Sequence, residues 1–196
     1  MAFLHHRLGG SPVPPPHRVK RFWLERLARR HRCRTLVETG TYQGDMVAAM
    51  LPAFARIVTI ELDPALARAA AARFHDRPEV EVLEGDAGRV LDGVLAGIDE
   101  RCAFWLDGHY SGPGTALGPR PTPILAELAA IARHRRRDHL ILIDDARCFG
   151  SEEGYPPLAT VVEALRAIDA GYRIDIRDDM IRALPSARNG RPESRP

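Results

Sequence analysis

The chain has 196 residues and a formal net charge of +2 at pH 7, which gives room for one domain and no strong attraction for nucleic acid. Its three cysteines, Cys33, Cys102 and Cys148, lack the paired spacing of a zinc site and favour reduced thiols over a disulfide framework. No apolar run reaches membrane-spanning length, so we expect a cytoplasmic protein that has no contact with a membrane.

Residues 1–17 are rich in proline and predict an irregular N-terminal arm. Residues 18–31 place apolar side chains at helical spacing between arginines, which predicts an amphipathic helix packed on the body of the domain. Phe22 and Trp23, which we expect this helix to expose, are candidates for a homodimer contact. The helix also carries Lys20, the only lysine of the chain.

Strands and helices then alternate. We expect strands over residues 35–40, 56–63, 80–86, 102–108 and 139–146, and helices over residues 45–54, 64–75, 87–98, 124–134 and 158–168. Residues 172–179 and 180–185 predict two closing strands, joined so tightly that they must be antiparallel. The predicted fold class is therefore α/β, a doubly wound, mainly parallel seven-stranded sheet with an antiparallel C-terminal hairpin. It forms a single domain over residues 18–185, and the polar residues 186–196 predict a disordered tail.

Ligands of such sheets bind beyond the carboxyl ends of the strands, so polar residues at these ends are candidate binding groups. The first strand ends in the turn LVETGTYQGD (residues 36–45), which lacks the G-x-G-x-x-G spacing of a dinucleotide site. Glu38, two residues before the turn, would repel a phosphate but can accept a hydrogen bond from an ammonium group or an ordered water.

Two further acids end the next strands. Glu61 lies roughly 20 residues beyond the first glycine, where an acid commonly binds ribose hydroxyls. Asp86 ends the third strand and can accept from an adenine amino group. A ligand with an amino-acid end, a ribose and an adenine, but no phosphate, satisfies Glu38, Glu61 and Asp86 together. The alternative is that these acids only cap the helices that follow, which applies most to Asp86.

The segments VETGTYQG, IELD and LEGDA, in this order, resemble the class I S-adenosylmethionine-dependent methyltransferases over roughly residues 34–184. The resemblance implies a Rossmann-like methyltransferase fold and S-adenosylmethionine as cofactor. The chain departs from the family pattern in having two glycines where many members show three, and Tyr42 stands in the loop, where it can pack over the cofactor. The cofactor-binding residues implied are Glu38, Gly40, Thr41, Tyr42, Gly44, Glu61, Leu62, Asp86, Ala87 and Asp107.

A second group of acids ends two neighbouring strands. WLDGHYSG contains Asp107, and LIDDAR contains Asp144 and Asp145. Three converging carboxylates repel one another unless a divalent ion binds them, or unless hydrogen bonds and arginines such as Arg147 neutralise them. This arrangement resembles the metal-dependent sugar and small-molecule O-methyltransferases of natural-product pathways, which implies Mg²⁺ at Asp107, Asp144 and Asp145. Those enzymes tend to have a second acid where this chain has His109.

His109 is a candidate general base that acts with Asp107, because an imidazole can take a hydroxyl proton near neutral pH. The alternative is a loop histidine that hydrogen-bonds a neighbour or ligates the metal. Residues 108–123, rich in glycine and proline, predict either a lid over the substrate or an ordinary loop. The candidate substrate-binding residues are Tyr110, Ser111, Thr115, Arg120 and Arg147.

The leading hypothesis is an enzyme that transfers the methyl group of S-adenosylmethionine to an oxygen of a small metabolite in bacterial secondary metabolism, with Mg²⁺ as a candidate cofactor. One alternative uses the same cofactor for cyclisation, cleavage or aminocarboxypropyl transfer. Another is a non-catalytic S-adenosylmethionine-binding module. A nucleic-acid substrate is the weakest reading, because only the basic residues 133–137 and the arginine-rich first helix support it.

Overall fold

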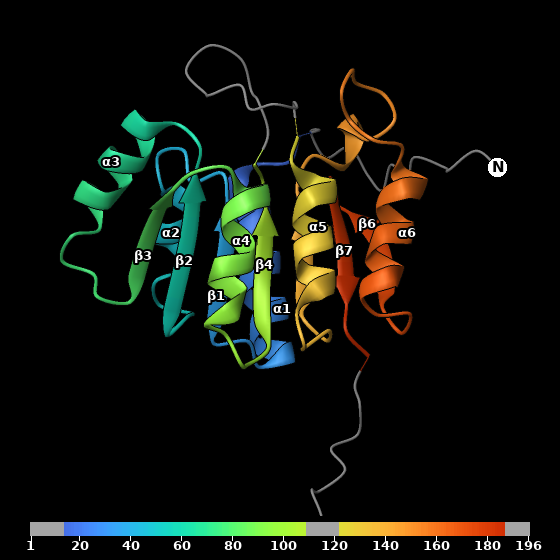
Figure 1. Cartoon of the computed structure of the whole chain (residues 1–196), viewed down its shortest axis with the longest axis horizontal. Coiled ribbons are helices and arrows are strands. Elements are labelled where there is room, and N and C mark those ends of the chain that lie inside the picture. The colour runs from blue at the N-terminus through green and yellow to red at the C-terminus, as the bar shows by residue number, and fades with distance from the viewer. Residues whose placement is uncertain (1–13, 109–121, 187–196) are drawn as a thin grey trace, which may run out of the picture.

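The computed structural model describes residues 14–108 and 122–186 (Figure 1). Residues 1–13 of the predicted arm and residues 187–196 of the predicted tail lie outside this range. A seven-stranded sheet forms the centre, in the order β3-β2-β1-β4-β5-β7-β6. The strands are β1 (Thr35–Thr39), β2 (Arg56–Glu61), β3 (Val80–Glu84), β4 (Cys102–Leu106), β5 (Leu140–Ile143), β6 (Arg173–Arg177) and β7 (Met180–Leu184).

The pairing of the strands confirms the predicted fold class. Strands β1 to β5 are parallel, whereas β7 runs antiparallel to both β5 and β6. The turn between β6 and β7 consists of Asp178 and Asp179, both left-handed, with φ of 50° and 61°. Two left-handed residues give the tight turn that matches the twist of a hairpin. The strand order reverses between β1 and β4, which places the topological switch point there.

Helices cover both faces of the sheet (Figure 1). One face is covered by α1 (His17–His31), α2 (Asp45–Met50) and α3 (Pro64–Arg73). The other face is covered by α4 (Ala87–Ala96), α5 (Ile124–Arg133) and α6 (Leu158–Ile168). A short 3₁₀ helix, η1 (Ala146–Cys148), follows β5. The helix α2 ends at Met50 and not at residue 54 as predicted, because Pro52 has no N–H to continue it. Among the described residues, no helix is long and apolar enough to span a bilayer.

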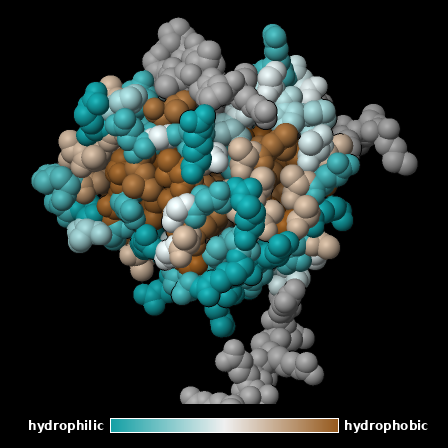
Figure 2. Space-filling view, viewed as in Figure 1, coloured by the Kyte–Doolittle hydropathy of each residue, from teal (hydrophilic) through white to brown (hydrophobic). Residues whose placement is uncertain are grey.

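Alternating side chains of the buried strands build two apolar cores, one on each face. Leu36, Ile57, Ala103 and Leu140 pack with α1 and α2, whereas Val37, Val58, Phe104 and Ile141 pack with α4, α5 and α6. Apolar residues also reach the surface where α4 lies beside β2 and β3 (Figure 2). The partly buried Leu83 and Val90 pack against the core that lies under α4, α5 and α6.

The start of α1 matches the predicted exposure of its two aromatic residues only in part, and the homodimer contact stays a prediction. Phe22 is 54% exposed. Trp23 is not exposed as predicted, because its indole N–H donates to Asp178 Oδ2 at 2.7 Å and Arg177 and Arg182 lie over its ring. Cation–π contacts of this kind fix the aromatic ring against the hairpin. Trp23 therefore attaches α1 to the turn between β6 and β7.

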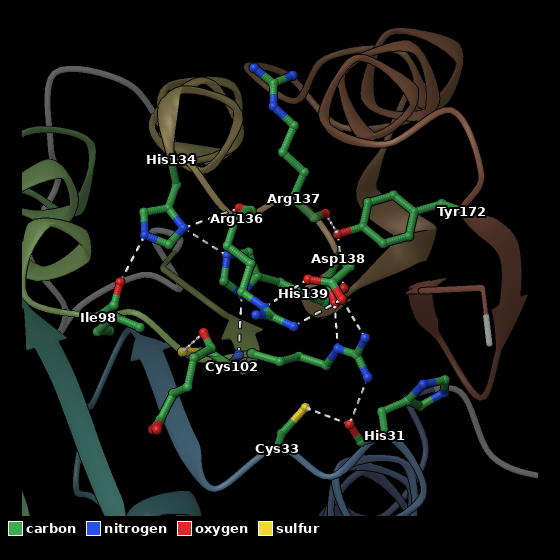
Figure 3. A network of polar contacts seen from close by, with 12 residues as sticks. His31, Cys33, Ile98, Cys102, His134, Arg136, Arg137, Asp138, His139 and Tyr172 are labelled. Carbon is green, nitrogen blue, oxygen red and sulfur yellow. Dashed lines mark hydrogen bonds and ion pairs between the residues drawn. The ribbon is translucent and has the colours of Figure 1, made fainter. Parts of the chain in front are cut away.

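A buried polar network joins the amino ends of β4 and β5 (Figure 3). His139, fully buried, accepts a hydrogen bond at Nδ1 from the Cys102 N–H at 3.1 Å, and its Nε2 lies 3.0 Å from His134 Nδ1, which also lies 3.1 Å from the Arg136 carbonyl oxygen. His134 Nε2 donates to the Ile98 carbonyl at 3.0 Å. The two imidazoles lie at the opposite end of the sheet from the switch point.

Candidate active site

The glycine turn after β1 packs directly on the end of β4. Gly40 has a φ of +83°, and a Cβ built there would lie 2.4 Å from the backbone oxygen of Asp107. Only glycine permits this approach, which brings the two strands together at the switch point. Gly44 is the N-cap residue of α2, and Tyr42, between the two glycines, has a φ of 49° and is 51% exposed.

Glu61 connects the end of β2 to this turn. Its Oε2 accepts from the Tyr42 N–H at 2.7 Å and its Oε1 from the Asp63 N–H at 2.9 Å. The side chain is buried, yet each carboxylate oxygen retains a second lone pair. Glu61 thus fixes the loop and keeps acceptor capacity for the hydroxyl groups of a ligand.

Glu38 is a buried acid on β1, with 1% of its surface exposed. Its Oε2 accepts from Thr59 Oγ1 at 2.6 Å, and Thr59 Oγ1 lies 2.5 Å from Thr41 Oγ1. Burial, with the charges of Asp107 and Glu61, raises the pKa of Glu38 to about 8. A cation placed beside Glu38 would relieve this strain on the charged form.

Asp86 caps α4, as its alternative interpretation states. Its Oδ1 accepts from the Gly88 N–H at 2.9 Å, and the side chain is partly exposed. Ala87 is the buried first residue of α4, and Leu62 is partly buried after β2. Capping does not use all the lone pairs of Asp86, so its role toward adenine stays a prediction.

A lysine from α1 lies between the acids that follow β5. Lys20 Nζ lies 2.5 Å from Asp144 Oδ2 and 3.6 Å from Asp145 Oδ1, and the lysine is only 7% exposed. Burial lowers the pKa of Lys20, but the two carboxylates outweigh it and the net shift is upward. Burial and Asp107 raise the pKa of Asp144, and Lys20 offsets part of this rise. The ammonium group is therefore a permanent charge at this position.

The predicted magnesium site at Asp107, Asp144 and Asp145 does not fit the described residues. Within residues 14–108 and 122–186, no group of three His, Cys, Asp or Glu side chains could hold a metal ion. Lys20 uses the Asp144 and Asp145 oxygens, and Arg147 Nη1 lies 2.7 Å from Asp145 Oδ1 and also contacts Asp179. The alternative prediction was that basic side chains neutralise these carboxylates. The structure shows this arrangement, with Lys20 as the main cation and Arg147 as a second one.

A small cavity lies between the ends of β4 and β5 and the start of α5. It is partly open to solvent, takes in about 220 Å³ including part of that solvent, and is lined by polar residues together with Leu106, Ile124, Ile143 and the ring of Phe149. The polar lining residues are Asp107, Thr122, Glu127, Asp144 and Tyr155. The cavity adjoins the switch point, because Gly108 lines it and Asp107 contacts the glycine turn.

Sequence reasoning missed Lys20 and Glu127. Lys20 carried a signal as the only lysine of an arginine-rich chain. Glu127 stands on the apolar stripe formed by Ile124, Leu128 and Ile131, where helical spacing already predicts burial. An acid on such a stripe is the pattern that would have revealed it.

Five predicted residues lie outside the described residues: His109, Tyr110, Ser111, Thr115 and Arg120. Their roles as general base and substrate contacts stay predictions. Arg147 is described, and its guanidinium is paired with Asp145 and Asp179. A substrate contact for Arg147 would have to use the donors that these pairs leave over.

Solved structures identify the fold. The O-methyltransferase from Bacillus cereus in complex with S-adenosylhomocysteine aligns with 89% of this chain and 84% of its own, at 16% identity and a TM-score of 0.62. This is the fold of the class I S-adenosylmethionine-dependent methyltransferases. The methyltransferase fold recurs in the O-methyltransferase TomG from Streptomyces achromogenes in complex with S-adenosylmethionine, at 19% identity over 86% of this chain and 80% of that chain, with a TM-score of 0.59.

The N-methyltransferase NodS from Bradyrhizobium japonicum has the same fold, at 13% identity over 87% of this chain and 97% of that chain, with a TM-score of 0.59. No protein family model matches the chain, and no curated protein matches it. Because enzymes that methylate oxygen and enzymes that methylate nitrogen share this fold, the fold leaves the acceptor atom open.

Proposed function

We propose that the chain is a methyltransferase that moves the methyl group of S-adenosylmethionine to an oxygen of a small metabolite. The carrying observation is the pair of buried acids on either side of the glycine turn, Glu38 and Glu61. Neither forms an ion pair with a described residue, and Glu38 resists ionisation in the free protein. Such a rim favours a ligand with a positive charge and hydroxyl groups and disfavours one with phosphates.

The described residues fit this cofactor. Glu38, supported by Thr59, would accept a hydrogen bond from the ammonium group, and Glu61 would accept from the ribose hydroxyls. The remaining acceptor capacity of Asp86 suits the adenine amino group. The bound cofactor supplies a methyl group on a sulfonium centre, and the task left to the protein is alignment and removal of a proton.

The oxygen target follows from the chemistry of the cavity. An acceptor hydroxyl must lose its proton as the methyl group arrives, and a carboxylate with a raised pKa is a suitable base near neutral pH. Glu127 lines the cavity, and burial raises its pKa to about 8. We therefore derive the reaction without a metal. The proposed setting is the cytoplasm, where the three free, buried cysteines would stay reduced.

Calorimetric titration with S-adenosylhomocysteine, with and without Mg²⁺, tests the site. We expect binding that does not depend on Mg²⁺ and that weakens by about tenfold in Glu61→Gln, because the amide cannot accept both backbone N–H bonds. Glu81→Gln, an exposed acid on β3, is the matched control. Absence of binding in the unmodified protein would remove the basis of the proposal.

Product analysis separates the uses of the cofactor. Incubation with S-adenosylmethionine and a mixture of small hydroxylated compounds should release S-adenosylhomocysteine in step with a methylated product. Release of methylthioadenosine would indicate cleavage, cyclisation or aminocarboxypropyl transfer instead. Binding without any turnover across the mixture would favour a non-catalytic module.

A further inference from the structure

Glu127 is an acid inside the apolar side of a helix. It lies on α5 with 1% of its surface exposed, between residues that pack into the core. Its Oε1 has no hydrogen-bond partner among the residues that the structure describes. Burial raises the pKa of Glu127 to about 8, with smaller contributions from Asp86 and Asp107. A buried polar atom without a partner costs about 1–3 kcal/mol, so its persistence calls for a function.

A second unpartnered group lies beside it. Thr39 Oγ1, at the end of β1, is also buried without a hydrogen-bond partner among the described residues. A Cβ built on Gly108 would lie 3.3 Å from Thr39 Oγ1 and 3.4 Å from Glu127 Oε1, so both polar atoms face the same point of the chain. The Thr39 hydroxyl lowers the pKa of Glu127 somewhat, but the two groups do not meet hydrogen-bond geometry. Thr39 Oγ1 and Glu127 Oε1 thus both lack a hydrogen-bond partner among the described residues, and both lie close to Gly108.

Glu127 and Gly108 both line the cavity beyond β4 and β5. The described lining also contains Asp107 and Asp144 and no lysine or arginine, and the nearby Lys20 is already paired with Asp144. When they are ionised, carboxyl groups at three sides repel an anion at this short range. Phe149 and Tyr155, packed edge to face at 5.3 Å, give the cavity an apolar wall.

We propose that Glu127 selects the methyl acceptor, by accepting a hydrogen bond from a hydroxyl or amino group of a small, partly apolar molecule that carries no negative charge. The inference rests on the proposed function, because the cavity is the place for an acceptor only if the glycine turn beside it holds the methyl donor. Acceptors with a carboxylate or a phosphate are excluded by the surrounding acids.

A set of four fragments with one ring in common tests the selection. Benzylamine is a cation, benzyl alcohol a neutral donor, benzyl methyl ether a neutral molecule without a donor, and benzoate an anion. Ligand-observed NMR gives the affinity of each for the full chain, with and without S-adenosylhomocysteine. We expect the amine and the alcohol to bind about tenfold or more tightly than the ether and the benzoate.

The variant Glu127→Gln keeps the shape of the side chain and removes the group that can ionise. We expect it to lose about tenfold in affinity for benzylamine, to gain affinity for benzoate, and to bind S-adenosylhomocysteine as the unmodified protein does. The control is Glu163→Gln, an exposed acid on the neighbouring helix α6. A merely structural Glu127 would change the melting temperature but not the order of the four fragments.

Three results would overturn the inference: equal binding of benzylamine and benzoate, an unchanged order in Glu127→Gln, or binding of none of the four. Failure of the proposed function has a different signature, because S-adenosylhomocysteine would then not bind to the unmodified protein. Because the fragments are also titrated without S-adenosylhomocysteine, their order of affinity is measured even if the proposed function fails.

Discussion

Lys20 Nζ lies 2.5 Å from Asp144 Oδ2, so the only lysine of the chain joins the first helix to the end of the fifth strand. This contact spans 124 residues of sequence and is buried on both sides. It brings a fixed positive charge to the edge where the glycine turn, Glu38 and Glu61 lie. Asp144 and Asp145 are therefore neutralised by the protein, whereas Glu38 and Glu61 are left for a ligand.

Replacement of Lys20 tests this division. In Lys20→Met, Asp144 and Asp145 lose the ammonium group and remain buried, which should lower the free energy of unfolding by about 3 kcal/mol. The double variant Lys20→Met/Asp144→Asn should recover part of this loss, because the carboxylate that needs the lysine is then absent. Urea denaturation measures both. Equal stability of Lys20→Met and the unmodified protein would show that the pair contributes nothing.

The raised pKa of Glu38 predicts a link between cofactor binding and pH. The ammonium group of the ligand prefers the ionised acid, whereas burial keeps Glu38 mostly protonated below its pKa of about 8. Affinity for S-adenosylhomocysteine should then rise with pH, by about tenfold per unit well below pH 8, and level off above it. Heats of binding in phosphate and Tris buffers should reveal the release of close to one proton at pH 7.

Glu38→Gln provides the control for that link. This variant should bind S-adenosylhomocysteine more weakly than the unmodified protein, and binding should release no proton from residue 38. The same proton count in Glu38→Gln and in the unmodified protein would show that another group titrates.

The glycine turn gives a prediction with an internal control. In Gly40→Ala, the new methyl group would meet the Asp107 backbone at 2.4 Å, so the ends of β1 and β4 must separate and cofactor affinity should be lost together with stability. In Gly93→Ala, on α4, nothing lies within 4 Å of the added carbon. That change should stabilise the helix by up to about 1 kcal/mol. Thermal unfolding and S-adenosylhomocysteine titration of both variants measure the difference, and similar behaviour of the two would contradict the close approach at Gly40.

The histidine pair at the other end of the sheet predicts sensitivity to acid. Burial, and then the neighbouring His134, lowers the pKa of His139 from 6.5 to about 4, while Asp138 acts in the opposite direction. Between pH 6.5 and 4 the unfolded chain binds a proton that the folded chain does not. The contribution of His139 is therefore fully present above pH 6.5 and is lost as the pH falls, at about 1.4 kcal/mol per unit.

Chemical denaturation at several pH values, with His139→Phe as the comparison, measures this slope. The variant should be less stable at pH 7, since the Cys102 N–H loses its acceptor, and its stability should fall less steeply in acid. Parallel slopes for the two proteins would assign the acid sensitivity elsewhere.

The sequence predicted the sheet well because each strand has its own local signal. Mainly apolar runs such as residues 36–37 and 57–60 are followed by an acid, and the helices between the strands have the period of one buried face. The positions of Glu61 and Asp107 at strand ends were predicted correctly because strand ends are fixed by the chain itself, and their roles in binding stay predictions. Lys20 and Glu127 were not found, because helices carry them, and only tertiary packing decides which strand end a helix residue reaches.

The prediction of a magnesium site overlooked Lys20 for the same reason. Asp107, Asp144 and Asp145 do end neighbouring strands, as the pattern implied. A strand pattern contains no information on which basic side chain will pack against these ends. The lysine that does so comes from a helix that precedes the first strand.

A crystal structure of the complex with S-adenosylhomocysteine tests the central claim most directly, namely that the acids after β1 and β2 share one ligand. It should show the ligand across the glycine turn, with its amino group near Glu38 and its ribose hydroxyls accepted by Glu61. A ligand bound elsewhere, or a complex in which Glu61 points away from the ribose, would contradict the account.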